Sequence, residues 1–247
     1  MTETETETPV AADPPLRIRY RIRFAKTGLL RWISHRDLAR LWERLLRRAA
    51  LKLSMTEGFH PKPRVAFPSA LALGVESLDE VVELELAEVL TPQALLERLQ
   101  NDNQPGLTIH SVCQLPERFG KAQLLSGDYI ITTIEGVSAE AINTAIAELL
   151  AKETVTVERK KKDMTVTVAS QITVLELKER EIQLTLAASE SASLKPTDVL
   201  DLLGFTDWIE KGALITRVRV VLEKELESSD PQVMAVAQLQ SSTESTK

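Results

Sequence analysis

Residues 16–24 read LRIRYRIRF, and this alternation of arginine with an apolar or aromatic residue decides the fold of the first half of the chain. A period of two is typical of a β-strand with one buried face. The same period directs Arg17, Arg19, Arg21 and Arg23 to the other face. Four unpaired arginines would repel one another there, so we expect an anion or acidic neighbours on that face.

The residues that follow predict a helix, two strands, a second helix and another strand. Ser34, with Asp37 three residues later, resembles a capping box and indicates a helix over residues 35–50. Strands are predicted within 53–68, 80–86 and 107–115, and a helix begins at Thr91-Pro92 and continues to about residue 100. This order, βαββαβ, is that of a ferredoxin-like fold.

The second half of the sequence repeats this order of strands and helices. The pattern predicts strands at 128–134, within 154–169 and 172–187, and at 213–222, with helices at 138–152 and 195–203. We therefore expect an α+β protein with two tandem ferredoxin-like (βαββαβ) domains, residues 16–120 and 121–226. The ends, 1–15 and 227–247, are rich in Thr, Ser, Glu and Gln and are predicted to be disordered tails.

Charge is distributed unevenly along the 247 residues. Segment 17–64 holds fourteen Lys and Arg against three acidic residues, so it is near +11, whereas the whole chain is −6 and the remainder is about −17. Such asymmetry predicts a local site for a polyanion on an otherwise acidic protein.

Composition also limits the classes of protein. The single cysteine, Cys113, excludes an internal disulfide and a site built on several thiolates. No apolar run approaches the length of a membrane span, and residues 1–15 lack the regions of a signal peptide. We expect a cytoplasmic protein with no membrane partner, no bound cofactor and no metal site.

Arginines recur every four residues on the first predicted helix, at Arg36, Arg40, Arg44 and Arg47 or Arg48. They form one stripe opposite the apolar face. The stripe is either a track for phosphates or an ordinary solvated face, since arginine is a good helix former.

The segment Gly58 to Arg64 reads GFHPKPR. Two prolines flank Lys62 and keep the backbone extended. A rigid loop that presents Phe59, His60, Lys62 and Arg64 suits stacking and phosphate contact with single-stranded RNA. The alternative is a stiff connector whose Phe59 plugs the core.

Two histidines, His35 and His60, lie in the basic segment. They could form the general acid/base pair of a metal-independent ribonuclease, or each could be structural. They have no ligand spacing that indicates a metal site. The run Arg159 to Lys162 is expected to be a hairpin turn.

Residues 24–77 carry three strings that resemble the family of radical SAM-linked proteins, a domain of unknown function. They are GxLRxxSHxDL at 28–38, GFHPxPR at 58–64 and LxLGVES at 71–77, and SASLKP at 191–196 resembles a later motif. In that family the domain is encoded beside, or fused to, a radical S-adenosylmethionine enzyme. The resemblance implies a stand-alone accessory protein whose partner is such an enzyme.

The leading expectation is therefore a non-catalytic accessory protein that binds transfer or ribosomal RNA and delivers it to a radical SAM enzyme. Two alternatives stay open, an endoribonuclease that uses His35 and His60, and a module that docks an acidic protein without RNA. The residues expected to bind RNA are Arg31, His35, Arg36, Arg40, His60, Lys62 and Arg64.

Overall fold

The computed structural model describes residues 16–102, 104–159, 162–189, 193–226 and 233–235. The two predicted tails, 1–15 and 227–247, lie outside the described residues, apart from 233–235. The first half consists of β1 (Ile18–Lys26), the 3₁₀ helix η1 (Gly28–Trp32), α1 (His35–Arg48), β2 (Val65–Ala66), β3 (Glu76–Leu86), α2 (Pro92–Gln100) and β4 (Leu107–Gln114). The second half consists of β5 (Leu124–Thr132), α3 (Ala139–Leu150), β6 (Thr154–Arg159), β7 (Lys162–Thr167), α4 (Val168–Gln171), β8 (Ile172–Lys178), β9 (Glu181–Ala187), α5 (Pro196–Leu202), β10 (Ile215–Leu222) and β11 (Val233–Ala235).

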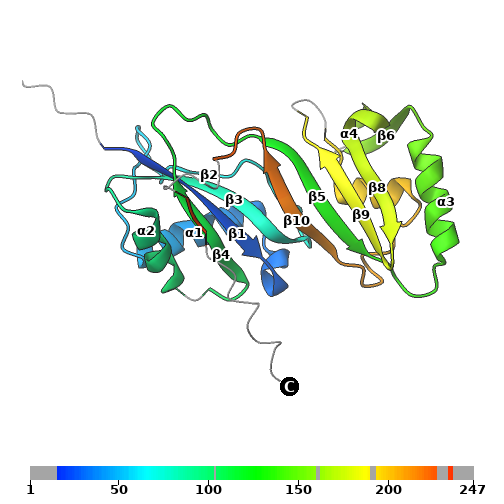
Figure 1. Cartoon of the computed structure of the whole chain (residues 1–247), viewed down its shortest axis with the longest axis horizontal. Helices are drawn as coiled ribbons and strands as arrows, with labels where there is room; N and C mark the ends of the chain where they lie inside the picture. The colour runs from blue at the N-terminus through cyan, green and yellow to red at the C-terminus, as the bar shows by residue number, and fades with distance from the viewer. Residues whose placement is uncertain (1–15, 103, 160–161, 190–192, 227–232, 236–247) are drawn as a thin grey trace, which may run out of the picture.

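One mixed sheet runs through both halves of the protein (Figure 1). In the described residues the sheet has nine strands: eight follow the order β11-β4-β1-β3-β10-β5-β9-β8, and β2 pairs with β3 outside this order. The halves meet where β10 pairs with β3 in parallel, with Thr216 beside Glu76 and Arg217 beside Ser77. The described chain is thus an α+β protein, as predicted.

Within each half, neighbouring strands are antiparallel. The first half has the order β4-β1-β3-β2 and the second has β10-β5-β9-β8. In the sequence, the hairpin β6–β7 and α4 come between α3 and β8. The hairpin forms a separate two-stranded sheet. The turn of that hairpin, predicted at Arg159 to Lys162, falls partly outside the described residues.

The strand predicted within 53–68 is mostly irregular. Only Val65–Ala66 forms a strand, and isolated bridges join Leu53 to Leu86 and Met55 to Pro63. Prolines at 61, 63 and 68 explain this, because each removes a backbone donor that a continuous ladder needs.

Helix α1 starts and packs as its sequence predicts. Ser34 is the N-cap: its Oγ accepts from the Asp37 backbone N–H at 3.2 Å and donates to the Asp37 carboxylate at 2.7 Å. The hydrogen bond from Ser34, with the charges of Arg40 and Arg36, lowers the pKa of Asp37. The buried face of α1 consists of Leu38, Leu41, Trp42, Leu45 and Leu46.

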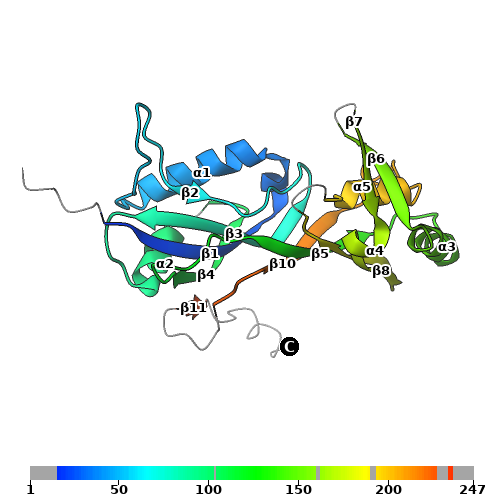
Figure 2. The ribbon, with the colours of Figure 1, turned by 90° about the horizontal axis from the view of Figure 1, so that it is seen from above.

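Two large hydrophobic cores lie along the sheet in the described residues. The first joins α1 and α2 to the apolar face of β1, at Tyr20, Ile22 and Phe24. The second lies in the other half but includes Leu71 and Val75 from the segment before β3. This segment therefore anchors the first half in the core of the second. Figure 2 shows α1 and α5 on the same side of the continuous sheet.

Candidate nucleic-acid interface

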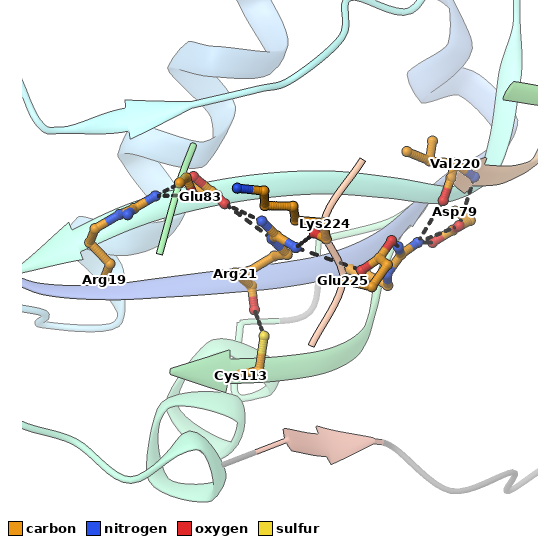
Figure 3. Close-up of polar contacts among 10 residues, drawn as sticks. Arg19, Arg21, Asp79, Glu83, Cys113, Val220, Lys224 and Glu225 are labelled. Carbon is orange, nitrogen blue, oxygen red and sulfur yellow. Dashed lines mark hydrogen bonds and ion pairs between the residues drawn. The ribbon is translucent and has the colours of Figure 1, made fainter. Parts of the chain in front are cut away.

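The arginines of β1 are paired with carboxylates (Figure 3). Arg19 and Arg21 both donate to Glu83 on β3, at 2.9 and 2.8 Å. Arg23 donates to both oxygens of Asp79, at 2.8 and 2.6 Å. The acidic neighbours expected from the alternation are thus present and come from the adjacent strand.

Two segments from elsewhere in the chain cover this row of ion pairs. Arg21 is buried, donates to the carbonyl of Lys224 at 2.9 Å, and lies 5.3 Å from the ring centre of Phe119. Arg23 also pairs with Glu225. Burial disfavours the charged form of Arg23, but the charges of Asp79 and Glu225 outweigh it and raise the pKa of Arg23. The β1 arginines therefore stabilise the fold and offer little surface for a nucleic acid.

Arg31 holds the turn before α1 against the segment before β3. Its carbonyl accepts from the Gly74 backbone N–H at 2.8 Å, and its guanidinium lies 5.0 Å from the Trp32 ring and 3.6 Å from Glu76. Gly74 has a φ of +83°, and a Cβ there would be 3.2 Å from the Trp32 ring. Arg31 and Trp32 thus pack as a unit on this glycine.

Trp32 is a candidate binding residue that the sequence reasoning missed. Its side chain is 54% exposed, and Leu29 in the same turn and Leu73 beside Gly74 are exposed as well. Trp32 falls between the alternation of β1 and the apolar face of α1, so neither period accounts for it. A large aromatic residue that fits neither period was the sequence feature that could have indicated an exposed binding residue.

The outer surface of α1 carries the predicted arginine stripe. Arg36 and Arg44 are exposed and make no ion pair within the described part of the chain. Arg40 lies 3.4 Å from Asp37, and Arg47 lies 3.8 Å from Glu43. Exposed pairs of this kind contribute little to stability, so a phosphate could replace the carboxylate at small cost.

The loop 58–64 presents an aromatic ring and two basic side chains to solvent. Phe59 is 101% exposed, so the alternative in which it plugs the core is wrong. His60 and Lys62 are exposed too, and the loop is tied at its base by Thr56, whose N–H donates to the Lys62 carbonyl at 2.8 Å. Arg64 is half-buried and donates to the Met55 carbonyl at 3.1 Å, which makes it part of that base.

The two histidines occupy different surroundings. His35 is the first residue of α1, and its ring meets Phe67 edge-on with centroids 5.2 Å apart. The segment between α1 and β2, which carries His60, rises past the other end of α1 in Figure 2. No contact joins the two rings in the described residues, so the ribonuclease alternative stays a prediction without structural support.

Residues 16–226, where described, contain no group of three or more His, Cys, Asp or Glu side chains placed to hold a metal ion. Over the same described ranges, no helix is long and apolar enough to span a bilayer.

The fold and the candidate site define an α+β protein with a basic, aromatic surface on one side of a continuous sheet. The chain belongs to the family described as "Uncharacterized protein conserved in bacteria (DUF2344)", which matches residues 19–196. No curated protein matches the chain.

A solved structure titled "Crystal Structure of a Cbf5-Nop10-Gar1 Complex" contains a similar chain, with 12% identity and a TM-score of 0.41. The match covers 81% of this chain and 48% of that one, so this chain spans about half the length of its structural neighbour. A likeness at this level assigns no function.

Proposed function

We propose that this protein is an accessory subunit of a radical SAM enzyme and binds single-stranded segments of RNA, such as transfer or ribosomal RNA. The binding surface, called here the basic face, consists of Arg36, Arg44, Phe59, His60 and Lys62. Support for the enzyme partner comes from the resemblance of residues 28–38, 58–64 and 71–77 to radical SAM-linked proteins.

The full exposure of Phe59 carries the RNA proposal. A phenyl ring outside the core forgoes about 2 kcal/mol of burial energy, so its position suits a ligand better than the fold. His60 and the positively charged Lys62 follow the ring in the same exposed loop. Bases stack on aromatic rings whatever their sequence, while nearby cations contact phosphates.

We further propose that each half is a ferredoxin-like unit. The orders β4-β1-β3-β2 and β10-β5-β9-β8 both correspond to the order 4-1-3-2 of a βαββαβ unit, once the β6–β7 hairpin and α4 are taken as an insertion. Such sheets serve RNA recognition in other proteins.

RNA binding is tested by fluorescence anisotropy with a labelled 20-nucleotide oligouridylate. Phe59→Ala is expected to weaken binding about tenfold, the cost of one lost stacking contact. Arg36→Ala with Arg44→Ala should reduce the slope of log affinity against log salt by about 2. Lys178→Ala, an exposed lysine on β8, is the matched control and should change neither quantity. An affinity that does not vary with salt would contradict the proposal.

A second candidate function is protein docking without RNA. The exposed apolar cluster of Leu29, Trp32 and Leu73 favours it, because contiguous apolar side chains on a surface commonly mark protein contacts. Co-purification of the radical SAM enzyme after nuclease treatment tests this function. Retention by the wild type and loss in Trp32→Ser would assign the cluster to the partner enzyme.

A further inference from the structure

A cavity of about 400 Å³ opens where the two halves meet, on a different part of the molecule from the basic face. Its volume lies within the range of small-molecule sites. The lining residues are Ser69, Ala70, Leu71, Ala72 and Val75 from the first half and Leu124, Tyr129, Arg159, Ser193, Leu194, Lys195 and Pro196 from the second.

Two strings singled out in the sequence meet in this cavity. The LALGVES segment contributes Leu71, Ala72 and Val75, and the SASLKP segment contributes residues 193–196. The RNA-binding surface accounts for neither string. The two strings lie more than a hundred residues apart in the sequence, yet both line the cavity at the junction of the halves.

A buried ion pair beneath the cavity fixes one wall. Arg217 is 1% exposed and donates to Glu80 at 2.8 and 2.5 Å. Its remaining nitrogen donates to Ser69 Oγ at 2.9 Å, and its guanidinium lies 6.0 Å from the Tyr129 ring centre. Ser69 and Tyr129 are therefore positioned before any ligand arrives, which reduces the cost of binding.

The charges around the cavity favour an anion. Arg159 pairs with Asp198, but its Nε is buried and has no hydrogen-bond partner in the described residues, which leaves a donor for a ligand oxygen. Lys195 is exposed, and its ammonium forms no ion pair in the described part of the chain. A phosphate oxygen is the acceptor that such a pair of cations suits best.

Apart from Ser69 and Ser193, most of the remaining lining is apolar. Leu71, Val75, Leu124 and Leu194 are aliphatic and Tyr129 adds an aromatic ring, so the interior suits a flat ring of low polarity. A ligand with a flat ring and one phosphate group matches both parts of the lining.

We propose that this cavity binds a nucleoside monophosphate unit, with its base among the aliphatic side chains and its phosphate at Arg159 and Lys195. The unit could come from a free mononucleotide or from one unstacked nucleotide of an RNA. Only the second source rests on the proposed RNA binding.

The test is a titration of the full chain with AMP, GMP, CMP and UMP, followed by calorimetry and by the backbone amide signals of Ala70 and Leu194. At least one nucleotide is expected to bind at a single site. Ala70→Phe should abolish binding, because Ala70 is an exposed lining residue whose enlargement fills the cavity without disturbing the core. Lys195→Ala should weaken it about tenfold, the loss of one charge-assisted contact.

Ala147→Phe is the matched control, an equal enlargement at an exposed site on α3 that does not line the cavity, and should bind as the wild type does. The proposal is overturned if none of the four nucleotides binds at millimolar concentration, or if Ala70→Phe binds as well as Ala147→Phe. Displacement of the nucleotide by the oligouridylate identifies RNA as the source, and RNA binding without displacement identifies the free nucleotide. Phe59→Ala leaves the cavity intact, so failure of the basic face is seen separately.

Discussion

Replacing Glu80 by glutamine is expected to lower the free energy of unfolding by about 3–5 kcal/mol, the usual cost of breaking a buried ion pair from one side. Glu80 and Arg217 are 4% and 1% exposed, so water cannot solvate the guanidinium once its partner loses its charge. Lys26 adds to the cost: burial already lowers its pKa, and the charge of Glu80 partly offsets that effect. The substitution therefore removes a carboxylate charge that offsets the burial of both Arg217 and Lys26.

The assay is urea unfolding followed by circular dichroism. The matched control is Asp102→Asn, because Arg48 meets Asp102 at the same 2.5 Å that separates Arg217 from Glu80, but with side chains 47% and 22% exposed. That exposed pair should contribute less than about 1 kcal/mol. A natural domain has about 5–15 kcal/mol of stability, so the difference is easily resolved.

Equal losses in the two variants would refute the reasoning, since burial would then add nothing to the pair. The double variant Glu80→Leu with Arg217→Met gives an independent check. Replacing both ions by apolar side chains should recover most of the loss, because the desolvation cost disappears together with the attraction.

Three further predictions concern single sites. Gly106→Ala should cost about 2 kcal/mol more than Gly136→Ala, measured by urea unfolding, since both glycines have positive φ but only at Gly106 would a Cβ lie 2.5 Å from a backbone oxygen. Burial raises the pKa of Cys113 to about 11, so its reaction with a thiol reagent at pH 9 should be about fiftyfold slower in the folded than in the urea-unfolded protein. The folded state then holds the extra proton, and stability should fall as the pH rises from 9 to 11; a flat profile would count against the shift. Ser34→Ala should lower the free energy of unfolding by about 1 kcal/mol through loss of the α1 cap, and an unchanged urea midpoint would argue against it.

Local patterns in the sequence predicted the elements well. The alternation of β1, the Ser34 cap and the Thr91-Pro92 start of α2 each depend on residues a few positions apart, and the structure has all three. The parallel contact of β3 with β10 depends on residues about 140 positions apart. No local period records such a pairing, so the continuous sheet could not be predicted from the sequence.

Contacts between distant segments also explain why some predicted binding residues are not exposed in the structure. The sequence indicated that the β1 arginines share a face, but their partners Glu83 and Glu225 come from distant segments. Arg64 was expected to be exposed because its side chain is polar, yet it supports the base of its own loop. Lys62 is exposed as expected, whereas the sequence left open whether Phe59 lies in the core, and the structure shows its ring exposed.

The parallel pairing of β3 with β10 determines what would happen if the chain were cut between its two halves. The halves share a sheet, Leu71 and Val75 lie in the second core, and Val81 packs with Val220 and Leu222. A peptide bond cut in the connection between β4 and β5 would leave all of these contacts in place. We expect the two resulting pieces to remain associated under native conditions and to separate only in denaturant, so the protein should behave as a split pair that reassembles without a covalent link.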